Sequence, residues 1–263
     1  MAARGAPLLA SALALLAACA SPPPASEPEA RAAYESAGDP LEPANRTLYG
    51  VSTSVDNAVV KPVARTYGED VPAAVRIHVT DFFRNLGTPR EFVNFVLAGK
   101  PRLAGTAFMR FLLDSTFGVG GLFDVASGLG YPRHATDLGL TLGFWGMPPG
   151  PYLYIPLLGP SDTRDAASAI ADIAPSPLTF VPGGTALTIT KYSLSGVDAV
   201  DTRQRALPTT DAIEQTALDP YATARSLYQQ NRQSAVAALR RANQATLPVW
   251  FSEPRPAPTP GPD

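Results

Sequence analysis

The single cysteine of this 263-residue chain stands at position 19, directly after a largely apolar stretch at residues 8–18. One cysteine excludes a disulfide within the chain. Since His78 and His134 are the two histidines, the sequence predicts no zinc site either. The fold must therefore be held by side-chain packing and polar contacts. A chain of this length can bury roughly 70–75% of its unfolded surface, which is enough for a real core.

The N-terminus has the layout of a bacterial lipoprotein signal. A basic start at Arg4 precedes the apolar stretch, which is too short to cross a bilayer because a spanning helix needs about 20 residues. The stretch ends in LAAC at 16–19, a pattern typical of a lipobox. We predict that residues 1–18 are removed and that Cys19 carries a lipid anchor. An ordinary signal peptide with an incidental cysteine is the alternative. Ala20, where aspartate would favour the inner membrane, favours the outer membrane.

Proline-rich segments flank the folded part. Residues 19–38 form a Pro- and Ala-rich tether that we expect to be extended. Residues 252–263 form a Pro-rich tail that we expect to be disordered. The domain between them, residues 39–251, shows no internal repeat. The net charge of −2 offers no basic face, so the composition argues against a nucleic-acid partner.

Proline and glycine punctuate a helical pattern in the first half of the domain. Apolar residues at helical spacing predict one helix that Asp70 caps and Gly87 ends. A capping box at residues 88–91 begins a second predicted helix, which ends at Gly99. Pro101 begins a third. This half of the domain is therefore expected to be α-helical.

The second half of the domain gives fewer but similar patterns. Ser161 is predicted to cap a helix, and Asp219 followed by Pro220 opens a long one. The long helix carries an apolar stripe on one face. Opposite that stripe lie Arg225, Arg232, Arg240 and Arg241. Residues 152–155 are the best strand candidate. The predicted class is mostly α with little β structure.

Phenylalanines are concentrated in three adjacent predicted helices, since eight of the eleven lie between Phe82 and Phe123. Residues 104–125 do not qualify as a membrane span because charges interrupt them at Arg110, Asp114 and Asp124. Two interpretations remain. Periodicity alone favours an ordinary soluble core, whereas helices lying in the plane of a membrane interface explain the aromatic density.

Catalytic patterns are missing from the sequence. There is no Gly-x-Ser-x-Gly elbow, and residues 118–121 lack the Lys-Ser/Thr of a phosphate loop. His134 lies near Asp137, but a base needs a nucleophile to act on, so we predict a loop histidine. The acidic residues are scattered and paired at most with nearby arginines. We predict neither an enzyme nor a cofactor or metal.

Several blocks of the sequence resemble the MlaA (VacJ) family of outer-membrane lipoproteins, in the family's order. They are DPLEPANRTLY at 39–49, KPVA at 61–64, FRNL at 83–86, NFVLAGKP at 94–101, RFLLDSTFGVGGLFDVA at 110–126, TLGFWG at 141–146, GPYLYIPLLGPSDTRD at 150–165 and LDPY at 218–221. The match runs from residue 39 to about residue 239.

The resemblance implies a ring-like helical domain lying in the inner leaflet of the outer membrane, with a central amphipathic channel. It further implies removal of mislocalised phospholipid from the outer leaflet, delivery to a periplasmic lipid carrier of the Mla system, and association with an outer-membrane porin trimer. The aromatic helices would then face lipid, which reverses the soluble-core interpretation. The membrane-facing residues predicted on this basis are Phe82, Phe92, Phe95, Phe108 and Phe111.

A glycine-rich loop corresponds by position to a loop beside the family's channel. The channel or gate residues predicted from it are Gly128, Gly130, Tyr131, Arg133, Asp137 and Gly143. Arg133 would meet a lipid phosphate, and Asp137 would pair with Arg133. The alternative is an ordinary solvated loop. Two other functions stay open: a scaffold lipoprotein that tethers outer-membrane partners without transport, and a lipid-modifying enzyme, against which the missing nucleophile argues.

Overall fold

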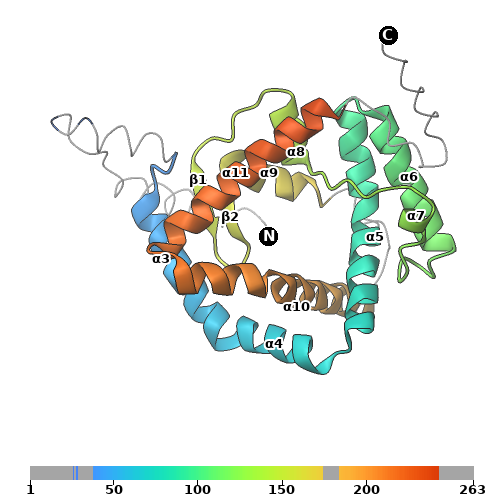
Figure 1. The fold of residues 1–263 in the computed structure, drawn as a ribbon, viewed down its shortest axis with the longest axis horizontal. Coiled ribbons are helices and arrows are strands. Elements are labelled where there is room, and N and C mark those ends of the chain that lie inside the picture. The colour runs from blue at the N-terminus through green and yellow to red at the C-terminus, as the bar shows by residue number, and fades with distance from the viewer. Residues whose placement is uncertain (1–25, 27, 29–37, 174–183, 243–263) are drawn as a thin grey trace, which may run out of the picture.

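A computed structural model describes residues 26, 28, 38–173 and 184–242. Its helices are arranged as a ring (Figure 1). The outline of the ring consists of α3 (Glu42–Val55), a π-helical turn (Asp56–Val60), α4 (Lys61–Asp70), α5 (Ala73–Leu97) and α11 (Pro220–Arg241). The ring expected from the family resemblance is thus the arrangement that these helices adopt.

Further elements attach to this outline. On the outer side of α5 lie α6 (Pro101–Thr116) and α7 (Val125–Gly128), and α10 (Thr185–Thr216) runs beside α4. Beside α11 lie α8 (Leu138–Phe144) and α9 (Thr163–Ala171).

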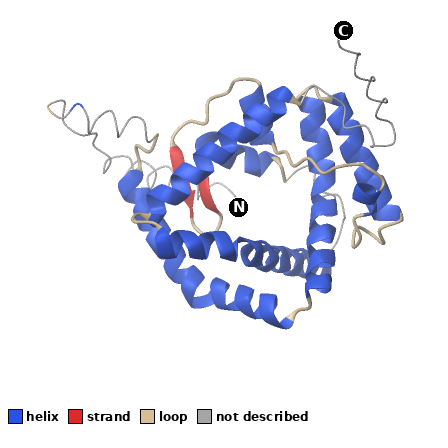
Figure 2. Ribbon diagram, in the orientation of Figure 1, coloured by secondary structure: helices blue, strands red, loops and turns tan. Residues whose placement is uncertain are grey.

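A single small antiparallel sheet is found in the described part of the chain (Figure 2). Its strands are β1 (Tyr152–Ile155) and β2 (Gly159–Asp162), with Tyr152 opposite Asp162 and Ile155 opposite Gly159. The strand expected at 152–155 is therefore present. The prediction of a mostly α fold with little β structure is confirmed.

Helix starts follow the local sequence in part. Asp219 caps α11 as predicted, since its carboxylate accepts a hydrogen bond from the Ala222 amide at 3.0 Å. Ser161 does not cap α9. Ser161 belongs to β2. The next residue, Asp162, is the cap, because its carboxylate accepts a hydrogen bond from the Asp165 amide at 2.8 Å. Strand pairing thus moves the cap by one residue.

The prediction of two helices separated at Gly87 is wrong, because α5 is continuous over 25 residues with Pro89 inside it. A proline inside a helix costs about 3 kcal/mol because it removes one backbone hydrogen bond and crowds the preceding turn. Packing against α6 on both sides of the proline offsets this cost, with Asn85 and Phe95 both buried. Thr88, predicted as a cap, instead donates to the carbonyl of Arg84 at 3.0 Å.

The start predicted for α5 also differs. Asp70 does not cap it but ends α4, and Pro72 occupies the N-cap position without a side-chain hydrogen bond. Extended backbone at Val71 and Pro72 separates the two helices. A proline fixes this extended entry to a helix, so the carboxylate is not needed.

One apolar core cluster joins α5, α6, α8 and α11. Phe95, Leu103, Leu140 and Leu239 are buried in it together with several alanines. The small alanines let the helices approach closely, and Phe92 and Phe144 pack against the edge of the cluster. This cluster fixes the corner of the ring at which α5 meets α11.

The opposite side of the ring is joined by polar contacts. Arg203 of α10 forms a bidentate ion pair with Asp56, with nitrogen–oxygen distances of 2.8 and 2.6 Å. Lys61 of α4 reaches Asp211 at 2.7 Å and Glu214 at 2.6 Å on α10. These contacts hold α10 beside the π-helical turn and α4.

Burial is inverted relative to a typical globular protein. Within the described residues, 20 polar or charged residues are buried against 11 hydrophobic ones, while 27 large hydrophobic side chains are exposed. Interiors of soluble proteins are normally enriched in Ile, Leu, Val and Phe. The contacts between its elements are therefore largely polar, while many large apolar side chains are exposed. None of its described helices combines the length and the apolar character that a bilayer crossing requires.

Candidate functional site

The loop predicted as a channel or gate element connects α7 to α8. It runs from the outer side of α5 toward α8 and α9 (Figure 1). Gly128 ends α7 and is exposed, and Gly130 follows at a φ of 84°. That backbone conformation suits glycine because a Cβ atom would be strained there. The loop thus turns sharply just after α7.

Arg110 of α6 holds the start of this loop through hydrogen bonds. Its guanidinium donates to the carbonyl of Tyr131 at 2.5 Å, to the hydroxyl of Ser127 at 2.9 Å and to the carboxylate of Asp124 at 2.9 Å. Burial by itself would raise the pKa of Asp124, but hydrogen bonds from Ser127 and the charge of Arg110 bring it below its ordinary value. Tyr131 is therefore held through its backbone, and its side chain is half-buried.

Arg133 pairs with a carboxylate that the sequence analysis did not connect to it. Its guanidinium Nη2 lies 2.8 Å from Glu91 Oε1 of α5, and the Glu91 side chain is 2% exposed. The predicted pair between Arg133 and Asp137 is thus wrong. A buried glutamate requires a partner, and Arg133 is the cation that supplies it. The second terminal nitrogen of Arg133, Nη1, is buried without a hydrogen-bond partner.

A small polar cavity lies between α5, α6 and this loop. Its volume of about 10 Å³ gives room for about one water molecule. Three arginines and three aspartates line it together with small and amide side chains: Asp81, Arg84, Asn85, Thr88, Arg110, Asp114, Gly121, Asp124 and Arg133. Burial raises the pKa of Asp114 there. Burial also lowers the pKa of His134, and the nearby charge of Arg110 adds to the effect.

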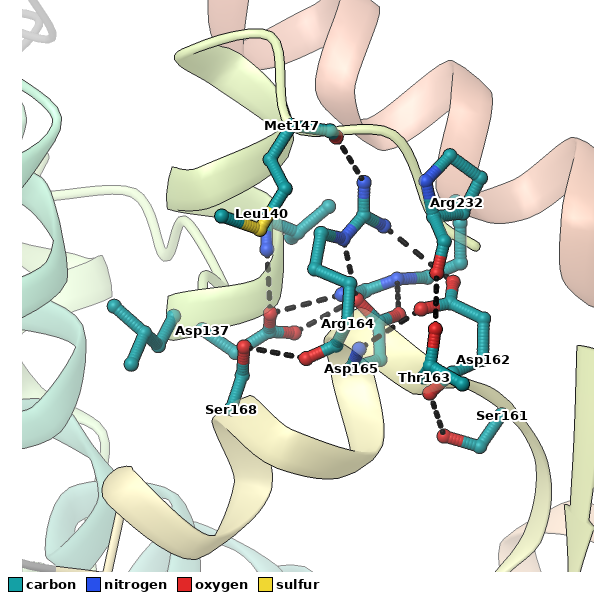
Figure 3. A network of polar contacts seen from close by, with 12 residues as sticks. Asp137, Leu140, Met147, Ser161, Asp162, Thr163, Arg164, Asp165, Ser168 and Arg232 are labelled. Carbon is teal, nitrogen blue, oxygen red and sulfur yellow. Dashed lines mark hydrogen bonds and ion pairs between the residues drawn. The ribbon is translucent and has the colours of Figure 1, made fainter. Parts of the chain in front are cut away.

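Asp137 ends the loop inside a second polar network (Figure 3). It caps α8 by accepting from the Leu140 amide at 2.8 Å, and Arg232 of α11 donates to both of its oxygens at 2.7 and 2.9 Å. Burial would raise the pKa of Asp137, but these hydrogen bonds from Arg232 lower it. Arg232 also contacts Asp165 at 2.5 Å. The network therefore ties the loop to α9 and α11.

Gly143 is a packing glycine rather than a residue that lines a passage. It is buried in α8, and a Cβ atom there would lie 2.7 Å from Arg164 Nη1 and 2.9 Å from a Val236 methyl. The channel role predicted for Gly143 is therefore wrong. A large substitution such as Gly143→Trp would disturb the helix packing and not simply block a channel.

Comparison with known proteins gives the family. A family model described as "MlaA lipoprotein" matches residues 37–235. This chain belongs to the MlaA lipoprotein family. Relatives described as "Intermembrane phospholipid transport system lipoprotein MlaA" are 33% identical over 201 residues in Haemophilus influenzae and 34% identical over 195 residues in Escherichia coli. These matches cover 75% and 72% of this chain, and 79% and 75% of the two relatives.

Two further comparisons agree with this MlaA assignment. An uncharacterized protein of Rickettsia felis is 32% identical over 223 residues, which cover 83% of this chain and 82% of that protein. A solved structure described as "Structural basis for maintenance of bacterial outer membrane lipid asymmetry" matches with a TM-score of 0.65 at 30% identity. It covers 75% of this chain and 98% of that one, so the fold of the domain is that of the family.

The phenylalanines predicted to face the membrane do not share one environment in this MlaA fold. Phe108 on α6 is 52% exposed, and Phe82, Phe92 and Phe111 are half-buried. Phe95 is 2% exposed and belongs to the apolar core, so its predicted exposure is wrong. On α5, Phe95 lies on the face that packs against Leu103 and Ala107 of α6.

Aliphatic residues supply much of the exposed apolar surface, which the phenylalanine pattern alone did not predict. Val75, Val93, Val96 and Leu97 of α5 are all exposed. A second exposed stripe follows α3, the π-helical turn and α4 at a spacing of four residues: Val51, Val55, Val59 and Val63. Valine periodicity was the sequence pattern that could have identified both.

Neither α10 nor the polar contacts at the start of the domain were predicted from the sequence. Asp39 is buried and accepts from Asn45 at 2.7 Å, from Arg225 at 2.9 Å and from the hydroxyl of Tyr221. The arginine face predicted for α11 therefore contributes Arg225 to an ion pair rather than to solvent. Cys19 and the Pro-rich tail lie outside the described residues.

Proposed function

We propose that this protein is an outer-membrane lipoprotein that moves mislocalised phospholipid out of the outer leaflet. In this proposal, Cys19 carries the acyl anchor and the ring lies in the inner leaflet on the periplasmic side. The lipid passes through a polar centre of the ring to a periplasmic carrier of the Mla system. The ring works beside an outer-membrane porin trimer, and it moves lipid without chemical turnover.

The observation that carries this proposal is the inverted burial of the ring. Apolar side chains on α3, α4, α5 and α6 are exposed, and hydrocarbon would cover them favourably. Buried polar groups make many of the contacts between elements, such as Thr80 with Asp201 at 2.9 Å and Glu91 with Arg133 at 2.8 Å. A lipid head group needs polar surroundings while it travels, because an unpaired charge in an apolar medium is costly.

Family membership supports the same proposal. The relatives in Haemophilus influenzae and Escherichia coli carry phospholipid transport in their names, and the solved structure concerns outer-membrane lipid asymmetry. The described residues include no group of three or more His, Cys, Asp or Glu side chains that could hold a metal ion.

The loop at residues 128–137 is proposed to lie beside the lipid path. Arg133 supports this because its Nη1 is buried without a partner while its Nη2 is held by Glu91. The cavity beside it has room for about one water molecule, so in this proposal the loop moves and the free N–H of the guanidinium then donates to a phosphate oxygen. Arg133 would then bridge Glu91 and a passing head group.

The test uses a strain that lacks this protein. It is compared with the same strain supplied with the wild-type protein or with the double variant Glu91→Gln, Arg133→Gln. Replacing both partners by neutral amides removes the ion pair without leaving a buried charge, so the fold should survive. Outer-leaflet phospholipid is measured through acylation of lipopolysaccharide at the cell surface. We expect deletion to raise this acylation, and the double variant to raise it at an unchanged protein level. Arg102→Gln, at the exposed start of α6, is the control.

A scaffold that tethers partners without transport predicts a different result. Deletion would then leave the outer leaflet free of phospholipid, which would overturn the proposal. If deletion raises the signal and the double variant does not, transport stands and the role of Arg133 fails. The anchor is tested separately: Cys19→Ala should leave a precursor without palmitate that does not reach the outer membrane.

A further inference from the structure

The turn between α6 and α7 exposes an unusual amount of apolar surface. Its sequence, FGVGGLF at residues 117–123, contains no charged or hydroxyl-bearing residue. Four of its side chains are exposed, Phe117 by 73%, Val119 by 63%, Phe123 by 46% and Leu122 by 38%. In water this arrangement is unfavourable, since each large apolar side chain gains free energy on leaving water.

The backbone of this turn is strained at its most prominent residue. Val119 has a φ of 53°, and Leu157 of the β1–β2 turn is the other non-glycine residue of the described chain with a positive φ. A β-branched side chain is strongly disfavoured in this conformation. Glycine would adopt it freely, and the neighbouring Gly120 and Gly121 do so. The turn thus keeps a valine at a position whose geometry favours glycine.

Hydrogen bonds to α6 and α5 also hold the backbone of the turn in place. The amides of Gly120, Gly121 and Phe123 donate to carbonyls of Ser115, Asp114 and Gly118 at 2.8–3.0 Å. Asn85 of α5 donates to the hydroxyl of Ser115 at 2.9 Å, and Gly121 packs so closely on Asn85 that a Cβ atom would clash. The apolar side chains are therefore presented by a preformed backbone rather than by a loose loop.

We propose that residues 117–123 form a preformed tip that inserts into the hydrocarbon of the membrane on which the ring lies. The proposal rests on the proposed function, because it requires the ring to lie on a bilayer. It adds a specific insertion site, at which Val119 is retained for its contact with lipid despite its backbone strain.

Two observations favour lipid over a protein partner as the occupant. The tip follows α6 on the outer side of α5, and Phe108 and Leu112 of α6 are also exposed, so the helix and the turn both present apolar side chains. Charged residues adjoin the tip: Asp124, directly after it, pairs with the buried Arg110 at 2.9 Å, and the half-exposed Arg84 lines the same small cavity as Gly121 of the tip. An uncharged tip next to charged residues matches the order of hydrocarbon and head groups in a bilayer. The lipoprotein family to which the chain belongs also makes a membrane surface the nearest partner.

A depth probe tests the placement of the tip. The mature chain, from residue 19 onward with Cys19→Ser, receives Val119→Cys as its single thiol and is labelled with an environment-sensitive fluorophore. Vesicles of phosphatidylethanolamine and phosphatidylglycerol contain quenchers attached to the acyl chains. We expect a blue shift and quenching at position 119, and neither at a matched Ser234→Cys on the exposed surface of α11.

The possible outcomes separate the tip from the proposed function. If the chain binds vesicles while the probe at position 119 stays in water, the tip proposal is overturned and the ring can still lie on the membrane through α5 and α6. If the chain does not bind vesicles, the membrane position of the whole ring fails together with the tip.

Val119→Gly provides a second, unlabelled test. Glycine relieves the positive φ, so the variant should fold with an equal or higher Tm. Removing the side chain from the hydrocarbon should lower partition into the same vesicles about tenfold. A purely structural role for Val119 predicts the reverse, a lower Tm with unchanged partition, and that result would overturn the proposal.

Discussion

Apolar packing holds one side of the ring, and ion pairs hold the other. Where α5 meets α6, α8 and α11, Phe95, Leu103, Leu140 and Leu239 are buried in one cluster. Where α4 and the π-helical turn meet α10, the buried residues are Ala64, Lys61 and Asp201, two of them charged. Both sides close the same ring, but the stability of one depends on buried apolar surface and that of the other on salt and pH.

The difference indicates which side opens more easily. Apolar packing is lost only when large surfaces separate, whereas ion pairs between partly exposed side chains weaken with salt and with protonation of the carboxylate. Regions with few buried apolar contacts also have low free energies of local opening. We infer that α10 separates from α4 before α5 separates from α11. Substitutions on each side, and a change of pH, test this inference.

The largest effect is expected from truncating the apolar side. Phe95→Ala should lower the free energy of unfolding by about 3–5 kcal/mol, because it removes a buried ring and leaves a cavity. Urea unfolding followed by circular dichroism measures the change. Phe108→Ala, at a residue 52% exposed on the neighbouring helix, is the control and should cost well under half as much. Equal losses would contradict the assignment of Phe95 to the core.

Overpacking the same side should have the next largest effect. Gly143→Ala places a methyl group 2.7 Å from Arg164 and 2.9 Å from Val236, so it should destabilise the fold by about 1–3 kcal/mol. Gly146→Ala is a different kind of control: no atom would crowd its Cβ, but its φ of 96° disfavours a side chain. A Gly143→Ala protein as stable as wild type would show that α8 and α11 are loosely packed.

Breaking the ion-paired side should act locally. Lys61→Ala removes the contacts to Asp211 and Glu214, and we expect a loss of about 1–2 kcal/mol, since both partners are partly exposed. Hydrogen exchange should show the loss in α10 and leave α6 unchanged. Arg65→Ala, whose side chain is 51% exposed, should have a smaller effect. A uniform rise in exchange over the whole ring would contradict independent opening.

Acid should produce the smallest effect, because carboxylates with lowered and with raised pKa values lie on both sides of the ring. Hydrogen bonds from Lys61 and Arg65 hold the pKa of Asp211 below its usual value. Its contribution to stability is therefore present above about pH 4 and is lost as the pH falls through the lowered value. Burial raises the pKa of Asp114 beneath the α6–α7 turn, so protonation there is favourable to the fold.

The measurement is hydrogen exchange between pH 5 and pH 3, corrected for intrinsic rates. Protection of residues 201–216 should fall relative to that of α6. Asp198 on α10 has a pKa raised by burial, so its protonation opposes the loss. Asp198→Asn should therefore sharpen the contrast. A parallel fall in protection on both sides would contradict the comparison.

The local sequence by itself determined where several helices and strands begin. Pro101 begins α6, Asp219 with Pro220 begins α11, and residues 152–155 form β1. Capping and proline geometry act within about four residues, so these limits can be read without knowing the fold. The ordered blocks of family sequence also pointed to the ring before any helix was placed.

Only the tertiary structure decided how distant parts meet. Arg133 and Asp137 are four residues apart, yet each pairs elsewhere, with Glu91 and with Arg232 respectively. Asp137 and Arg232 are 95 residues apart, and nothing local selects that pair. Packing of α5 on α6 likewise overrode the break expected at Gly87, and it buried Phe95 while Phe108 stayed exposed. The physical reason is that burial and ion pairing depend on which surfaces the closed ring brings together, whereas sequence patterns report only the preferences of each segment alone.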